Sequence, residues 1–310
     1  MSISSALYSL SDAFGLALLH SLWQFSLLIL VALGIRKLLG PWLCAKSAYR
    51  LYLGILLLAT GLFCYTFAEL YEPPVLVSET EATTIRCNEI ESAIPVIQTD
   101  AGLYDYFSLE FVLSTLRTNT VLISLLWLLG CLFYSLAYAR ALRQLRRLRS
   151  SAADSLPDNW AKQFDDLLQS TKITRRVRLA VSPLVTSPLT IGHFKPVILL
   201  PIGLLLQLPT AQVEAILLHE LGHIQRYDYL TNLLQNGIKT LFFYHPAVHI
   251  LCRKMDEERE NACDDFAVSH NQNPVVLVRA LSALTLNRQS TSPTLALHLT
   301  HPDYPIVNRL

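Results

Sequence analysis

The chain has 310 residues, of which 52% are apolar and only 16% are charged, and its mean hydropathy is +0.37. Soluble domains usually carry about a quarter charged residues, so this composition favours insertion into a membrane. The formal net charge of +1 gives no support to direct nucleic-acid binding, which relies on a strongly basic surface.

Three segments are long and apolar enough to cross a bilayer, which takes about 20 helical residues. They run approximately over Phe14–Ile35, Leu51–Ala68 and Thr120–Ala139. The first segment has no basic stretch before it, and its apolar run is longer than that of a signal peptide, so we expect it to stay in the membrane. Residues 1–139 are therefore predicted to form a membrane domain with three transmembrane helices.

Basic residues predict the orientation, because positive charges near the ends of membrane helices stay on the cytoplasmic side. Such residues lie between the first two spans and after the third span: Arg36, Lys37, Lys46 and Arg50, then Arg140, Arg143, Arg146, Arg147 and Arg149. The loop over residues 69–119 holds nine acids against two arginines, which suits the outer face. We expect a multi-pass protein of a bacterial-type cytoplasmic membrane, with its amino terminus and this loop outside and residues 140–310 in the cytoplasm.

Six cysteines are spread along the chain without a CxxC pair: Cys44, Cys64, Cys87, Cys131, Cys252 and Cys263. This spacing suits neither a disulfide framework nor a thiolate zinc site, so we interpret them as mostly free thiols. In the predicted topology only Cys87 meets an oxidising compartment. Cys263 lies close to the metal-binding motif described below. We predict that it is buried and packs like a small apolar side chain.

The part after the third span has the pattern of an α+β domain. Apolar residues at helical spacing predict a helix over Asp158–Thr171, and alternation over Val177–Val181 predicts a strand. The stretch Pro188–Pro201 predicts two short strands that turn near Gly192. Such a hairpin beside a catalytic helix would offer an edge to an extended peptide.

A metal-binding motif lies on the next predicted helix, which Thr210 is suited to cap and which continues to about Gln235. His219 and His223 stand four residues apart, so both imidazoles lie on one helical face and can bind one ion. Glu220 lies beside such an ion, where it can take a proton from a bound water. This is the H-E-x-x-H arrangement, which is a good but not a decisive signal by itself.

A hydrolytic zinc site needs three protein ligands and an open position for water. Metallopeptidases of the H-E-x-x-H-x-x-G-x-x-H class have a third histidine ligand six residues after the second. That class is excluded here, because Tyr229 stands at this position. A later acidic run offers three glutamates on a predicted helix: Glu257, Glu258 and Glu260. We choose Glu260 as the third ligand, and Asp264 as the carboxylate that orients a ligand histidine. On spacing alone, a solvated acidic helix face is an equally good interpretation.

Polar residues outside the motif are given structural roles. His20 and Gln24 lie one helical turn apart inside the first span and are predicted to form hydrogen bonds between helices. His245 and His249 are interpreted as helix-start and packing residues. Arg226 and Asp228 are interpreted as members of structural ion pairs.

Five stretches resemble a known family: His20–Gln24 (HSLWQ), Ser187–Pro201 (SPLTIGHFKPVILLP), His219–Gln235 (HELGHIQRYDYLTNLLQ), Phe242–Leu251 (FFYHPAVHIL) and Glu258–Asp265 (ERENACDD). The family is that of the integral-membrane zinc peptidases typified by the BlaR and MecR β-lactam-sensing antirepressors. Five ordered motifs over nearly the whole chain are far more specific than one. The resemblance implies a zincin-like domain of the gluzincin type within a membrane α-helical bundle, a Zn²⁺ cofactor, and Glu260 as the third ligand.

Two late residues are candidates by resemblance alone. Related membrane peptidases of the prenyl-protein and heat-shock type carry a late His-Pro followed by Arg-Ile or Arg-Leu, which matches His301-Pro302 and Arg309-Leu310 here. This implies that His301 and Arg309 stabilise the oxyanion or bind the substrate backbone, a role that needs a donor near the developing charge. As isolated residues they would be surface or capping groups.

The activity implied by the resemblance is that of a zinc-dependent endopeptidase in signal-dependent regulation. Its substrate would be a cytoplasmic or membrane-proximal protein, either a transcriptional repressor or the peptidase itself. The antirepressors continue beyond the point matching Leu310 into a further span and an outer penicillin-binding sensor, and no S-x-x-K site lies outside the membrane here, so direct β-lactam sensing is not expected of this sequence. A quality-control peptidase for membrane proteins and a non-proteolytic signalling or scaffold protein stapled by zinc stay open as alternatives.

Overall fold

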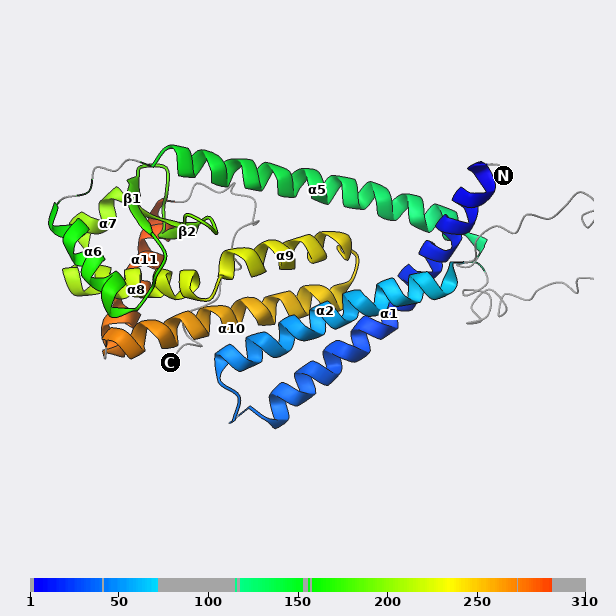
Figure 1. Ribbon diagram of the computed structural model, residues 1–310, viewed down its shortest axis with the longest axis horizontal. Helices are drawn as coiled ribbons and strands as arrows, with labels where there is room; N and C mark the ends of the chain where they lie inside the picture. Colours follow the sequence, from blue (N-terminus) through cyan, green and yellow to red (C-terminus); the bar gives the residue numbers. More distant parts are fainter. Residues whose placement is uncertain are drawn as a thin grey trace, which may run out of the picture. The chain divides into compact units, whose positions relative to one another are not determined.

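The computed structural model of the chain is mostly helical and has one small sheet (Figure 1). The structure describes residues 3–40, 42–71, 115, 118–152, 156, 158–271 and 273–291. Most of the predicted outer loop over residues 69–119, together with His301 and Arg309, lies outside the described residues. The chain divides into two compact units, Met1–Leu28 with Leu57–Cys131, and Ile29–Leu56 with Leu132–Leu310.

Three described helices are long and apolar enough to cross a membrane: α1 (Ile3–Leu38), α2 (Ala45–Leu70) and α5 (Thr120–Ser150). Each contains a predicted span and extends beyond it. The last turns of α1 and α5 are basic. Lysine and arginine are good helix formers and interact favourably with the carboxyl end of a helix dipole, so these helices continue past their apolar segments.

One of the two polar residues inside the first span has the predicted role. Gln24 of α1 donates through Nε2 to Thr66 Oγ1 of α2 at 3.1 Å, which is the expected bond between helices. His20 differs, because its Nδ1 accepts from Trp23 Nε1 at 3.3 Å within α1 itself. An aromatic donor one turn away on the same helix satisfies this imidazole without a second helix.

The sheet lies in the second unit and has the strand order β1-β3-β2. Its strands are β1 (Arg178–Ser182), β2 (Leu189–Ile191) and β3 (Val197–Pro201), with β1 parallel and β2 antiparallel to β3. The predicted hairpin is confirmed, and its turn holds Gly192 at φ +96°, a conformation that costs glycine little. The central strand β3 is buried over its first four residues, whereas β2 is an edge strand of the described sheet.

Six helices accompany the sheet: α6 (Asp158–Ser170), α7 (Ile202–Gln207), α8 (Thr210–Gln225), α9 (Asp228–Leu241), α10 (Pro246–Asn271) and α11 (Pro274–Thr291). Helix α8 is the centre of the core, since its buried Leu217 and Leu221 pack in one cluster with Ile198 and Leu200 of β3. On another side α8 approaches α10 closely at Gly222, where a Cβ atom would meet Phe266 Cδ1 at 3.2 Å. The absence of a side chain there allows the two helices to bring their polar residues together.

The single helix predicted from Thr210 to about Gln235 is wrong, because the structure ends α8 at Gln225 and starts α9 at Asp228. Tyr227 between them adopts left-handed backbone angles, with φ 63° and ψ 31°. Its ring lies under the guanidinium of Arg175, with Cζ 3.6 Å from the ring centroid. This tertiary contact holds a conformation that no local glycine or proline indicates. Thr210 also makes no capping bond, since it is the first helical residue after Pro209.

The turn between α9 and α10 agrees with the structural roles predicted for its histidines. Helix α10 begins at Pro246, where the missing amide hydrogen costs no helical bond. His245 is buried directly before it, and His249 Nε2 lies 2.8 Å from the carbonyl oxygen of Phe243.

Candidate metal centre

Two helices bring together the three predicted ligands. His219 and His223 project from α8, and Glu260 projects from α10, with one ligand atom from each lying within 4.8 Å of the others. His219 Nε2 is 3.5 Å from Glu260 Oε2, and His223 Nε2 is 3.9 Å from Glu260 Oε1. Ligands that hold zinc tetrahedrally at about 2.0–2.1 Å lie about 3.4 Å apart, so a small adjustment of these side chains would suffice.

Each imidazole is oriented by a carboxylate at its other nitrogen. His219 Nδ1 lies 2.9 Å from Asp264 Oδ1, the residue predicted for this position. His223 Nδ1 lies 2.9 Å from Asp228 Oδ2, which the sequence had suggested only as an ion-pair partner. Metal-binding histidines usually donate their second N–H to a carboxylate or carbonyl in this way, and both Nε2 atoms are thereby directed to Glu260.

Asp228 is the functional candidate that sequence reasoning missed. It is the first residue of α9, is almost fully buried, and also makes the expected ion pair with Arg226, whose Nε is 3.6 Å from Oδ1. The left-handed turn at Tyr227 directs its carboxylate back toward His223. No periodicity indicates that turn, so the sequence offered no signal for this contact.

The electrostatic environment suits a cation. Burial lowers the pKa of His219, but the hydrogen bond with Asp264 and the contacts with Glu260 outweigh it and raise the pKa to about 10. The surroundings of His219 therefore favour a positive charge at neutral pH. A divalent ion held by both histidines and Glu260 would be favoured by the same carboxylates, and its binding would release the imidazole proton.

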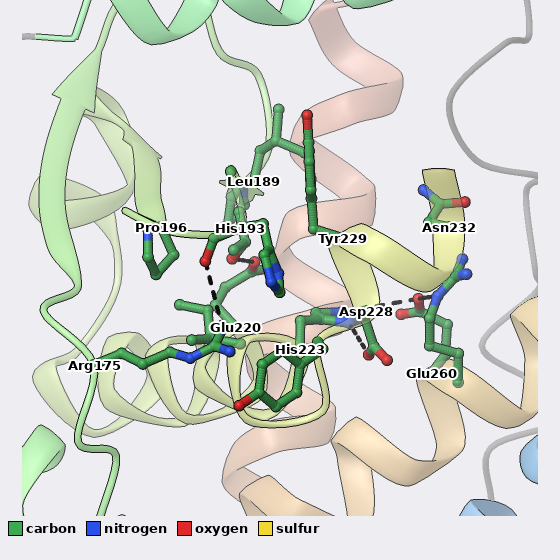
Figure 2. A pocket seen from close by; sticks show the side chains of 16 residues that line it. Arg175, Leu189, His193, Pro196, Glu220, His223, Asp228, Tyr229, Asn232 and Glu260 are labelled. Carbon is green, nitrogen blue, oxygen red and sulfur yellow. Dashed lines mark hydrogen bonds and ion pairs between the residues drawn. The ribbon is translucent and has the colours of Figure 1, made fainter. Parts of the chain in front are cut away.

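Glu220 is buried and is not one of the residues whose ligand atoms converge. Its Oε2 accepts a hydrogen bond of 2.6 Å from Thr190 Oγ1 of the edge strand β2. Glu220, His223 and Glu260 line one cavity of about 120 Å³ together with residues of β2 and of the turn after it (Figure 2). The predicted base thus faces the same space as two predicted ligands, and Thr190 fixes one of its oxygens.

Cys263 lies beside His223 and is buried, as expected from the sequence. Its Sγ is 3.3 Å from His223 Nδ1 and 3.6 Å from Asp228 Oδ2. These three side chains form a second group with metal-binding atoms close together. Burial and the nearby carboxylates raise the pKa of the thiol well above its usual value, so we interpret Cys263 as a neutral donor to Asp228.

The comparison with protein families bears on these residues. The chain matches the family described as BlaR1 peptidase M56 over residues 16–291. The chain belongs to this family of membrane peptidases. This confirms the resemblance drawn from the five sequence motifs, and the matched range includes every described residue of the metal centre.

Several curated relatives of this peptidase family are similar to about half of the chain. The methicillin resistance mecR1 protein of Staphylococcus aureus (strain Mu50) is 31% identical over 149 residues, which cover 47% of this chain and 25% of the relative. The regulatory protein BlaR1 of Bacillus licheniformis is 27% identical over 162 residues, or 52% of this chain and 27% of the relative. The matched part spans about a quarter of these relatives' length.

Proposed function

We propose that the chain is a membrane-bound, zinc-dependent endopeptidase that cleaves a cytoplasmic or membrane-proximal protein in signal-dependent regulation. The observation that carries this proposal is the convergence of His219, His223 and Glu260, with Glu220 lining the same cavity as the last two. Residues 1–139 would form the membrane domain, and residues 140–310 the gluzincin-like peptidase domain on the cytoplasmic side.

The donor set fits zinc, because two imidazoles and one carboxylate are the ligands of a common class of hydrolytic zinc site. When bound, zinc would lower the pKa of a coordinated water to about 7 and polarise the scissile carbonyl. His219, His223 and Glu260 would hold the ion. Only three protein ligands converge among the described residues, which supports hydrolysis rather than structural stapling, since a structural site normally closes with a fourth.

The chain's own residues supply the proton transfers. Glu220 would accept the proton of the attacking water and deliver it to the leaving amine. Thr190 donates to Oε2 of this carboxylate, which leaves Oε1 for the proton. The backbone of β2, at the edge of the described sheet, would pair with an extended substrate and set the scissile bond near Glu220. His301 and Arg309 stay predictions for stabilising the oxyanion.

The substrate class is proposed from the resemblance to the antirepressors, and the relatives' names, a regulatory protein and a methicillin resistance protein, agree with a regulatory role. A transcriptional repressor, or the chain itself, would be the target. The test is zinc analysis of the purified protein in a bilayer, followed by comparison of cleaved proteins in cells with and without the gene. One or two products would support a regulatory peptidase, many unrelated membrane-protein products would indicate quality control, and none would contradict the proposal.

Replacing Asp228 by asparagine is expected to weaken zinc binding about 10–100-fold, as is usual when the partner of a ligand histidine is changed. Asparagine keeps the size of the side chain but loses the charge that holds His223 Nδ1–H at 2.9 Å. Competition with a chromogenic chelator would measure the affinity. The matched control is Asp265→Asn, an exposed carboxylate near the same site, which should leave it unchanged. Equal affinities for both variants would remove Asp228 from the metal centre.

A further inference from the structure

Helix α9 combines an exposed leucine face with buried polar residues. Its exposed side carries leucines at helical spacing: Leu230, Leu233, Leu234 and Leu241. Leu230 and Leu234 are 48% and 44% exposed, whereas the polar residues Asp228 and Gln235 are only 4% and 2% exposed. A helix on a water-exposed surface shows the opposite arrangement, with its apolar stripe facing the core.

The buried polar residues of α9 are satisfied inside the protein. Gln235 Nε2 donates to the carbonyl oxygen of Cys252 at 3.2 Å and to Asp256 Oδ1 at 3.0 Å, both on α10. The Oδ2 atom of Asp228 lies 2.9 Å from Nδ1 of His223 at the metal centre. Polar contacts, together with the buried Ile238, therefore hold α9 to its neighbours, and leucines face outward. An exposed leucine face is unfavourable in water. It is favourable in the hydrocarbon of a bilayer, because the polar groups of the helix point inward and are bonded within the protein.

The turn after α9 contacts the inner part of the third candidate span. The ring of Tyr134 on α5 stacks on Phe243, with centroids 5.0 Å apart and planes inclined by 24°. Tyr138 Oη donates to the carbonyl oxygen of Leu233 at 3.4 Å. Both tyrosines lie within the predicted span, which ends at Ala139, so Tyr134 is about 7 Å from that end along the helix. In the predicted topology, Phe243 therefore packs against a residue at hydrocarbon depth.

We propose that α9 and its turn into α10 insert into the bilayer as a re-entrant hairpin, with the outward leucines in contact with lipid acyl chains. The 14 residues of α9 extend about 21 Å, too short to cross a hydrocarbon core of about 30 Å. Helices α9 and α10 run antiparallel (Figure 1), and the metal centre takes Asp228 from the start of α9 and Glu260 from the middle of α10. The hairpin therefore enters and leaves at the face where the site lies.

This inference changes the expected topology, because residues 140–310 would not lie wholly in the cytoplasm. Asn232, on the polar side of α9, lines the candidate catalytic cavity. The cavity would then open beside the membrane surface, within reach of a membrane-proximal substrate segment. The inference depends on the polarity and contacts of α9, and does not depend on peptidase activity.

Site-specific photo-crosslinking in the full chain, reconstituted in phosphatidylglycerol and phosphatidylcholine vesicles, tests the proposal. The photoreactive residue p-benzoylphenylalanine would replace Leu234 or Leu241, and lipid adducts would be detected by mass spectrometry. The matched control is Asn232, which is also exposed on α9 but on its opposite side. The positive control is Leu129, which is 64% exposed within the span of α5.

Lipid adducts at Leu234 and Leu241, at yields near that of Leu129 and at least five-fold above that of Asn232, are the expected result. Adducts at Leu129 without adducts at the two leucines would overturn the proposal. Crosslinks from Leu234 to a second copy of the chain would equally overturn it, because a protein interface would then cover the leucine face. Because both leucines are exposed, they should accommodate a bulky apolar replacement, and an unchanged melting temperature would confirm folding of each variant.

Discussion

Replacing Glu220 by glutamine is expected to lower kcat for peptide cleavage by about 10³-fold, because general acid–base catalysis contributes roughly 10²–10⁴ to such reactions. Glutamine keeps the shape of the side chain and can still accept the Thr190 hydrogen bond, but it cannot take a proton from water. Zinc content should stay at the wild-type level, since Glu220 is not among the converging ligand atoms. Single-turnover cleavage and metal analysis of the same preparation would measure both quantities.

A companion substitution separates proton transfer from positioning. Thr190→Val removes the 2.6 Å hydrogen bond to Glu220 without changing the carboxylate, and should lower kcat by about 10-fold with little effect on KM. Thr190→Ser keeps the hydroxyl and should restore most of the rate.

A Glu220→Gln enzyme that cleaves at the wild-type rate would remove Glu220 from the mechanism.

Replacing Glu260 by glutamine is expected to reduce zinc affinity by several hundred-fold and to abolish cleavage at limiting zinc. Structural zinc sites with four ligands gain roughly 10–16 kcal/mol, or about 2.5–4 kcal/mol for each ligand, and the carboxylate also contributes the negative charge. Glu260 supplies both oxygens that face the histidines, at 3.5 and 3.9 Å. Its loss leaves two imidazoles, which hold zinc weakly. Affinity would be measured by competition with a zinc chelator.

The control lies on the same helix. Glu257 pairs with Lys254 at 2.6 Å on the partly exposed side of α10, so Glu257→Gln should bind zinc like the wild type. The melting temperature of the metal-free Glu260→Gln protein shows whether the fold is retained. A folded variant with wild-type zinc affinity would contradict the assignment of Glu260, and would restore the alternative of an acidic helix face.

The sequence indicated the main elements of the second unit because they depend on local pattern. Alternation and helical periodicity predicted β1, the hairpin at Gly192 and α6, all within one or two residues of the observed bounds. Spacing alone could not identify the third zinc ligand, because the acidic run suited a solvated helix face equally well. We chose Glu260 from the acidic run, the family resemblance strengthened that choice, and the structure places Glu260 close to both histidines.

What the sequence determined by itself was the set of apolar spans and the pair of histidines on one helix, since both follow from spacing along the chain. Tertiary structure decided which further groups complete the site: Thr190 from the sheet, and Asp228 after the turn at Tyr227. It also decided that the leucines of α9 face outward and its glutamine inward. These features depend on contacts between segments far apart in the sequence, and periodicity within one segment carries no information about its neighbours.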